Sequence, residues 1–114
     1  MSTTQIDAMI RKTLREMIEY GGLEETPESI SAFAQNKLDF PVTLEQTKAA
    51  LVRTLVKKIS AYPIEEDEEA VEDVQSFLGV TSLQSIPWAS YGYETLEKVH
   101  AILRYNNAPN LLHE

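Results

Sequence analysis

Proline and glycine residues divide this chain of 114 residues into five main segments, each long enough to form one helix. Within the segments, apolar side chains recur every three or four residues, the period of a helix that buries one face. No segment sustains the apolar–polar alternation of a half-buried strand. The pattern therefore predicts an all-α fold, a compact bundle of about five helices in one domain over residues 1–114. The breaks lie at Gly21–Gly22, Pro27, Pro41, Pro63, Gly79 and Pro87.

Capping residues set the expected helix starts. Thr3 or Thr4 can cap the first helix, and Thr26 precedes a proline at the first helical position of the second. Thr43 and Gln46 fit a capping box, in which two side chains satisfy each other's backbone amides. We expect helices over residues 4–20, 27–39, 43–62, 65–78 and 93–105, the last with Pro87 as an alternative start.

The C-terminal half carries three further expectations. Thr81 and Gln84 repeat the capping-box pattern, which predicts one short helical turn before the next proline. Residues 106–114 contain Pro109, and we expect this segment to form a frayed tail. The apolar residues expected to be buried on the fourth helix are Ala70, Val71, Val74, Phe77 and Leu78.

Charge is distributed unevenly along the chain. The formal net charge is −8, yet residues 1–62 carry eight basic and eight acidic side chains and are neutral. Residues 63–114 hold two basic and ten acidic side chains, and seven of those ten lie within residues 65–73. Such asymmetry indicates a preference for particular partners and carries no information about the fold.

Composition excludes several classes of protein. Without cysteine the chain can form no disulfide, thiolate nucleophile or cysteine-ligated zinc site. No apolar stretch approaches the eighteen residues of a membrane span, so we expect no membrane association. The N-terminal segment lacks the basic and apolar regions of a secretory signal, and we expect a cytoplasmic protein.

Few residues could carry chemistry. His100 and His113 are the only histidines, and no nucleophile or phosphate-binding motif accompanies them. Glu97 and His100 have the Glu-x-x-His spacing that di-iron helical bundles use twice, but it occurs once here. We interpret Glu94, Glu97 and His100 as residues of a solvated helix face. We therefore expect no catalysis, no metal site and no cofactor.

Residues 27–58 resemble a helix-turn-helix unit. The run Val42–Thr43, followed by Thr47, Leu51 and Leu55, is similar to the spacing in recognition helices of helix-turn-helix and winged-helix proteins. The sequence departs from that pattern because its turn, DFPVT, is longer and has no glycine, and because this half has no net positive charge. The resemblance implies a DNA-binding face at Gln46, Arg53 and Lys57, where glutamine and arginine could read bases and lysine could hold phosphate.

Two segments of the acidic half are candidate surfaces for a protein partner. Glu65, Glu66, Glu68 and Glu69 could steer a basic protein toward the chain. Trp88, Tyr91 and Tyr93 lie within six residues, and such aromatic side chains are favoured interface anchors. Trp88 could equally fill the core, whereas we expect the two tyrosines to be more exposed.

Our leading hypothesis is a small acidic protein that acts by binding another protein with a basic surface. An inhibitor, an immunity-type antagonist and a regulatory adaptor all fit this description. The alternative is a helix-turn-helix regulator that binds nucleic acid with residues 1–62 and uses its acidic half for dimerisation or control. The sequence leaves the oligomeric state open, including a homodimer.

Overall fold

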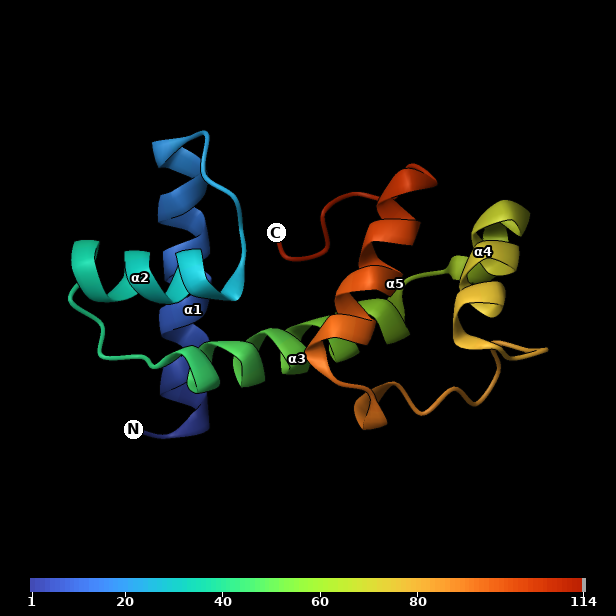
Figure 1. The fold of residues 1–114 in the computed structure, drawn as a ribbon, viewed down its shortest axis with the longest axis horizontal. Coiled ribbons are helices and arrows are strands. Elements are labelled where there is room, and N and C mark those ends of the chain that lie inside the picture. The colour runs from blue at the N-terminus through green and yellow to red at the C-terminus, as the bar shows by residue number, and fades with distance from the viewer. Residues whose placement is uncertain (114) are drawn as a thin grey trace. The chain divides into compact units, whose positions relative to one another are not determined.

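The protein is all-α, as predicted. A computed structural model describes residues 1–113, and within them the chain forms five α-helices, two short 3₁₀-helices and no strand (Figure 1). No helix in this range is both long and apolar enough to cross a bilayer. The elements are α1 (Thr3–Tyr20), α2 (Pro27–Lys37), α3 (Leu44–Ala61), η1 (Ile64–Glu66), α4 (Glu68–Leu78), η2 (Trp88–Ser90) and α5 (Tyr93–Tyr105).

The chain forms two compact units, and the boundary between them falls inside α3. The first unit contains Met1–Leu51 together with His113, and the second contains Val52–Leu112. The neutral and acidic halves of the sequence, which meet at residue 62, therefore do not coincide with the two units.

The first unit is built on α1 and α2, and α2 runs across α1 (Figure 1). The sequence predicts most of the buried face of α1. Of the six apolar residues expected on that face, Ile6, Ile10, Leu14 and Met17 are buried, whereas Met9 is half-buried and Ile18 is 47% exposed. From the other elements of this unit, Ile30, Ala34, Val42, Ala50 and Leu51 complete its buried apolar set.

Local capping explains where these helices begin. The cap of α1 is Ser2, not Thr3 or Thr4, because the Ser2 side chain and Gln5 form a reciprocal capping box. Thr26 caps α2 through the backbone N–H of Ser29, as predicted. The predicted box at α3 is also present: Thr43 Oγ1 accepts from the Gln46 N–H over 3.1 Å, and the Thr43 N–H donates to Gln46 Oε1 over 3.0 Å.

Side-chain hydrogen bonds hold the turn between α2 and α3. The Ser31 hydroxyl donates to the carbonyl of Val42 over 3.1 Å. Gln35 Nε2 donates to that same carbonyl over 2.7 Å and to Ser31 Oγ over 3.0 Å. Both Ser31 and Val42 are buried, so these bonds satisfy a carbonyl that solvent does not reach.

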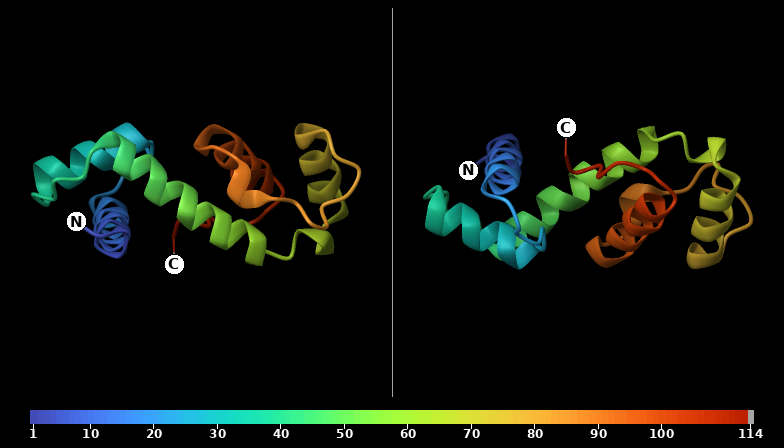
Figure 2. Two further views of the ribbon diagram at one scale, coloured as in Figure 1. Left: turned by 90° about the horizontal axis from the view of Figure 1, so that it is seen from below. Right: turned by 90° about the horizontal axis from the view of Figure 1, so that it is seen from above.

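The second unit is organised around one apolar cluster, in which α4 and α5 contact each other and lie side by side in every view (Figure 2). Asp67 caps α4 by accepting from the N–H groups of Glu69 and Ala70, and Gly79 ends the helix in the left-handed conformation. The helix therefore starts at Glu68, whereas residues 64–66 form η1. The buried members of the cluster are Leu55, Ile59, Ile64, Ala70, Val74, Leu96, Val99, Leu103, Ala108 and Leu111.

Two predictions for this unit are wrong. No helical turn opens at Thr81, because the Ser82 hydroxyl accepts from the Gln84 N–H and a positive φ at Ser85 then turns the chain away. Residues 106–112 do not fray, since Ala108 and Leu111 are buried in the apolar cluster. Asn106 closes α5 by donating from its backbone N–H and its side-chain amide to the carbonyl of Ile102.

Candidate interaction surface

The predicted acidic residues form a solvent-exposed face on η1 and α4. Glu65, Glu66, Glu68 and Glu69 are all exposed, and α4 adds two more exposed carboxylates, Glu72 and Asp73. We call these six residues the acidic face. The helix tolerates them because four of the carboxylates lie at or before its first turn, where the partial positive charge of the helix dipole favours anions.

Almost no group in residues 1–113 forms an ion pair or a hydrogen bond with the carboxylates of the acidic face. In the part of the chain that the structure describes, no ion pair involves Glu65, Glu66, Glu68, Glu69 or Glu72. Asp73 accepts one hydrogen bond, from the side-chain amide of Asn106 over 3.1 Å. The acidic face therefore carries a negative potential that solvent and salt screen, and it attracts cationic groups.

An exposed aromatic side chain borders the acidic face. Phe77 is 40% exposed, which overturns the prediction that it is buried with the other apolar residues of α4. The buried side of α4 follows Ala70, Val74 and Leu78 at intervals of four residues, so position 77 lies at its edge, one turn after Asp73. Lys98 Nζ lies 5.9 Å from the centre of the Phe77 ring, on the neighbouring helix α5.

The predicted aromatic segment is largely part of the fold. Trp88, Tyr91 and Tyr93 are each half-buried and pack against the apolar cluster of the second unit. The rings of Trp88 and Tyr91 meet edge to face, with centroids 6.1 Å apart. Neither tyrosine is fully exposed, because all three side chains fall in the half-buried class. Their remaining exposed edges could touch a partner, but packing already explains their presence.

The residues of the DNA-binding alternative all lie on α3, on either side of the boundary between the two units. Gln46 belongs to the first unit, and its side-chain oxygen Oε1 accepts a hydrogen bond in the capping box of α3. Arg53 and Lys57 are exposed on α3 within the second unit. Recognition helices bring their N-terminal residues to base edges. Here the first turn of α3 presents Glu45, whose carboxylate would face phosphate groups of the same sign.

The histidines have structural surroundings that the sequence did not reveal. His100 is buried, with 5% of its surface exposed, and its Nε2 accepts from the backbone N–H of Leu111. Glu94 and Glu97 are exposed, so the interpretation of all three as one solvated face is wrong for His100. His113 Nε2 lies 2.7 Å and 2.9 Å from the two carboxylate oxygens of Glu25. Residues 1–113 contain no group of three potential ligands that could hold a metal ion.

Comparison of the chain with known protein families, with curated proteins and with solved structures gave no match. The assignment of function therefore depends on the physical properties of these surfaces.

Proposed function

We propose that this protein acts without catalysis, by binding a protein that presents a basic surface to the acidic face and to Phe77. The observation that carries the proposal is the set of exposed carboxylates on η1 and α4 that form no ion pair within residues 1–113. An inhibitor, an antagonist or a regulatory adaptor in the cytoplasm fits this description.

The two components of the surface have different roles. Clustered charge accelerates the encounter with an oppositely charged protein and suppresses binding of acidic ones. Affinity in such interfaces comes mainly from a few well-packed side chains, and aromatic residues are common among them. Phe77 can provide such an anchor, because part of its ring is exposed beside Asp73.

Three observations favour a protein partner over DNA. The net charge of the chain is −8, whereas DNA affinity comes mainly from cationic side chains that contact phosphate groups. Gln46 already has a structural hydrogen bond. The first turn of α3, which would approach the bases, carries the exposed Glu45.

The test compares two variants of equal charge. In the first, Glu65, Glu66, Glu68 and Glu69 are changed to glutamine, and in the matched control Glu19, Glu24, Glu94 and Glu97 are changed, all of them exposed. Proteins captured by the wild type at low salt are identified, purified and measured for association rate with each variant. Loss of steering by the acidic face should slow association about tenfold, while the control stays within about twofold.

Two results would contradict the proposal. Equal slowing by both variants would assign the effect to net charge, and unchanged rates in both would remove the acidic face from binding. A parallel titration with mixed-sequence duplex DNA addresses the alternative. Salt-sensitive DNA binding that Arg53→Ala and Lys57→Ala abolish would instead support the helix-turn-helix hypothesis.

A further inference from the structure

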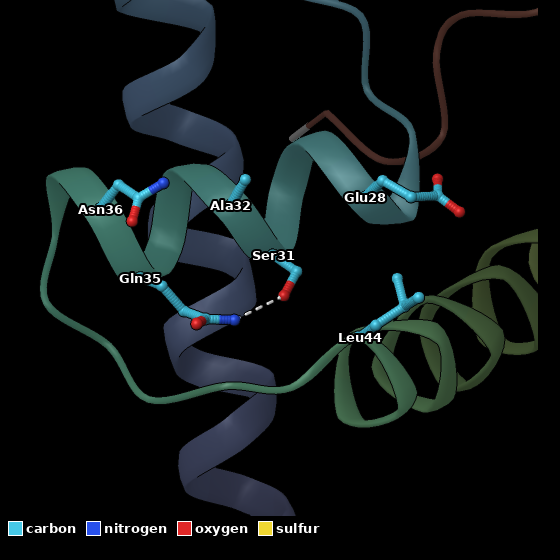
Figure 3. Close-up of a pocket in the computed structure, with 6 residues that line it drawn as sticks. All are labelled: Glu28, Ser31, Ala32, Gln35, Asn36 and Leu44. Carbon is cyan, nitrogen blue, oxygen red and sulfur yellow. Dashed lines mark hydrogen bonds between the residues drawn. The ribbon is translucent and has the colours of Figure 1, made fainter.

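The first unit contains a hollow of about 330 Å³ between the outer side of α2 and the start of α3 (Figure 3). Three of its polar residues recur along α2 at helical spacing, and the first residue of α3 closes one side. The residues that line it are Glu28, Ser31, Ala32, Gln35, Asn36 and Leu44.

Hydrogen bonding determines which polar atoms remain available in the hollow. Gln35 uses its side-chain amide nitrogen to donate to Ser31 Oγ and to the Val42 carbonyl. The hydroxyl hydrogen of Ser31 is used as well, since it donates to the same carbonyl. The carbonyl oxygen Oε1 of Gln35 is therefore the group that this side chain can offer a ligand, and it can only accept.

The charges around the hollow also favour a ligand that donates hydrogen bonds. Glu28 is exposed and forms no ion pair within the described residues, and no cationic side chain lines the hollow. The start of α3 carries partial positive charge, but Glu45 in its first turn offsets it and repels anions. Ala32 and Leu44 add apolar surface between the polar groups. The hollow thus combines a carboxylate and an amide acceptor with a short apolar wall.

We propose that this hollow binds an arginine or lysine side chain from a basic segment of a protein partner. The aliphatic part of the side chain would pack on Ala32 and Leu44, as long basic side chains commonly do on apolar surface. Its cationic end would bind the Glu28 carboxylate, and Gln35 Oε1 and the Asn36 side chain can add neutral acceptors. The proposal rests on the proposed function for the nature of the partner, and it adds a contact on the unit that lacks the acidic face.

The hollow can be tested with a small probe. The full chain, labelled with ¹⁵N, is titrated with acetyl-Gly-Arg-Gly-amide and, separately, with the same peptide containing citrulline, the neutral analogue of arginine. We expect saturable shifts at Ser31, Gln35 and Asn36 with the arginine peptide and not with the citrulline peptide. Glu28→Gln should weaken binding about tenfold, as removal of one charged hydrogen-bond partner typically does. The matched control is Glu24→Gln, an exposed glutamate that does not line the hollow.

Four outcomes would overturn the site, and a fifth would separate it from the proposed function. Equal shifts with citrulline, equal weakening by both variants, or preferential binding of inorganic phosphate would all exclude a cation-selective hollow. Shifts confined to residues 65–73 would exclude it while leaving the acidic face as the binding surface. Arginine binding in the hollow, combined with unchanged partner association in the acidic-face variant, would instead retain the hollow and reject the proposed function.

Discussion

The backbone N–H of Leu111 donates to Nε2 of His100 over 2.8 Å, and both residues are buried. Since Nε2 accepts this hydrogen bond, the neutral ring carries its proton on Nδ1. The bond joins the segment after α5 to the helix itself, and it satisfies the backbone amide of Leu111, a buried member of the apolar cluster.

Removal of this acceptor should destabilise the second unit. His100→Phe keeps a ring in place but leaves the Leu111 amide without its partner, which should lower the free energy of unfolding by about 1–3 kcal/mol. His100→Gln retains a side-chain acceptor and should lose less. Urea denaturation of the two variants measures the difference. Equal stability of His100→Phe and the wild type would show that this hydrogen bond contributes nothing.

Leu111 should behave as a core residue although only three residues of the sequence follow it. Leu111→Ala removes a side chain that is 8% exposed and should cost about 2–4 kcal/mol of stability. The control is Tyr105→Ala at the end of α5, where the side chain is 87% exposed and the expected change is within about 0.5 kcal/mol. Similar losses for the two variants in thermal or urea unfolding would contradict the packing of residues 106–112.

Local signals explain which parts of the fold could be predicted from the sequence. The capping box of Thr43 and Gln46 and the left-handed Gly79 involve residues within one turn of a helix end, so the sequence alone identifies them. The burial of Leu111 depends on an apolar surface formed by α3, α4 and α5, and its own segment is too short to show any periodicity. Non-local packing therefore explains why the sequence does not predict the burial of Ala108 and Leu111.

Some features of the candidate site could also be predicted from the sequence, and others could not. Exposure of Glu65, Glu66, Glu68 and Glu69 follows from their charge, because unpaired carboxylates are rarely buried. Exposure of Phe77 does not follow from its residue type, and it depends on how far around α4 the contact with α5 extends. The hydrogen bonds that leave only acceptor atoms available in the hollow beside α2 involve Ser31, Gln35 and Val42, which sequence spacing did not single out.

Glycine at position 79 should matter for its backbone conformation alone. Its φ is +70°, and a Cβ added there would meet no atom within 4 Å. Gly79→Ala should therefore cost about 1 kcal/mol from strain in the left-handed region, without any clash. Gly79→Asn is a matched control, because asparagine tolerates the left-handed conformation at the end of a helix and should cost only a few tenths of a kcal/mol. Chemical denaturation of both variants tests this, and equal costs would rule out the conformational explanation.

Substitutions at Phe77 and Tyr91 should distinguish a residue that binds the partner from a residue that stabilises the fold. Phe77 is 40% exposed beside the acidic face, whereas Tyr91 is half-buried and meets Trp88 edge to face. Tyr91→Ala should lower the free energy of unfolding by about 1–3 kcal/mol, because it removes an aromatic contact and packed area. Phe77→Ala should cost less than about 1 kcal/mol, because much of its ring already contacts water.

The binding measurement should show the opposite order. With the protein partner captured by the wild type, Phe77→Ala should increase the dissociation rate about 30-fold if the ring fills a pocket on that partner, which corresponds to an anchor of about 2 kcal/mol. Tyr91→Ala, measured under conditions in which it remains folded, should change that rate by less than about threefold. Biosensor dissociation kinetics and urea denaturation of the same two preparations give both values. A large loss of stability for Phe77→Ala without a change in dissociation would make Phe77 a packing residue and remove the anchor from the proposed surface. If Tyr91→Ala instead speeds dissociation strongly and changes stability little, the aromatic segment is part of the interface. A side chain that contributes to affinity but little to folding contacts the partner more than the rest of the chain.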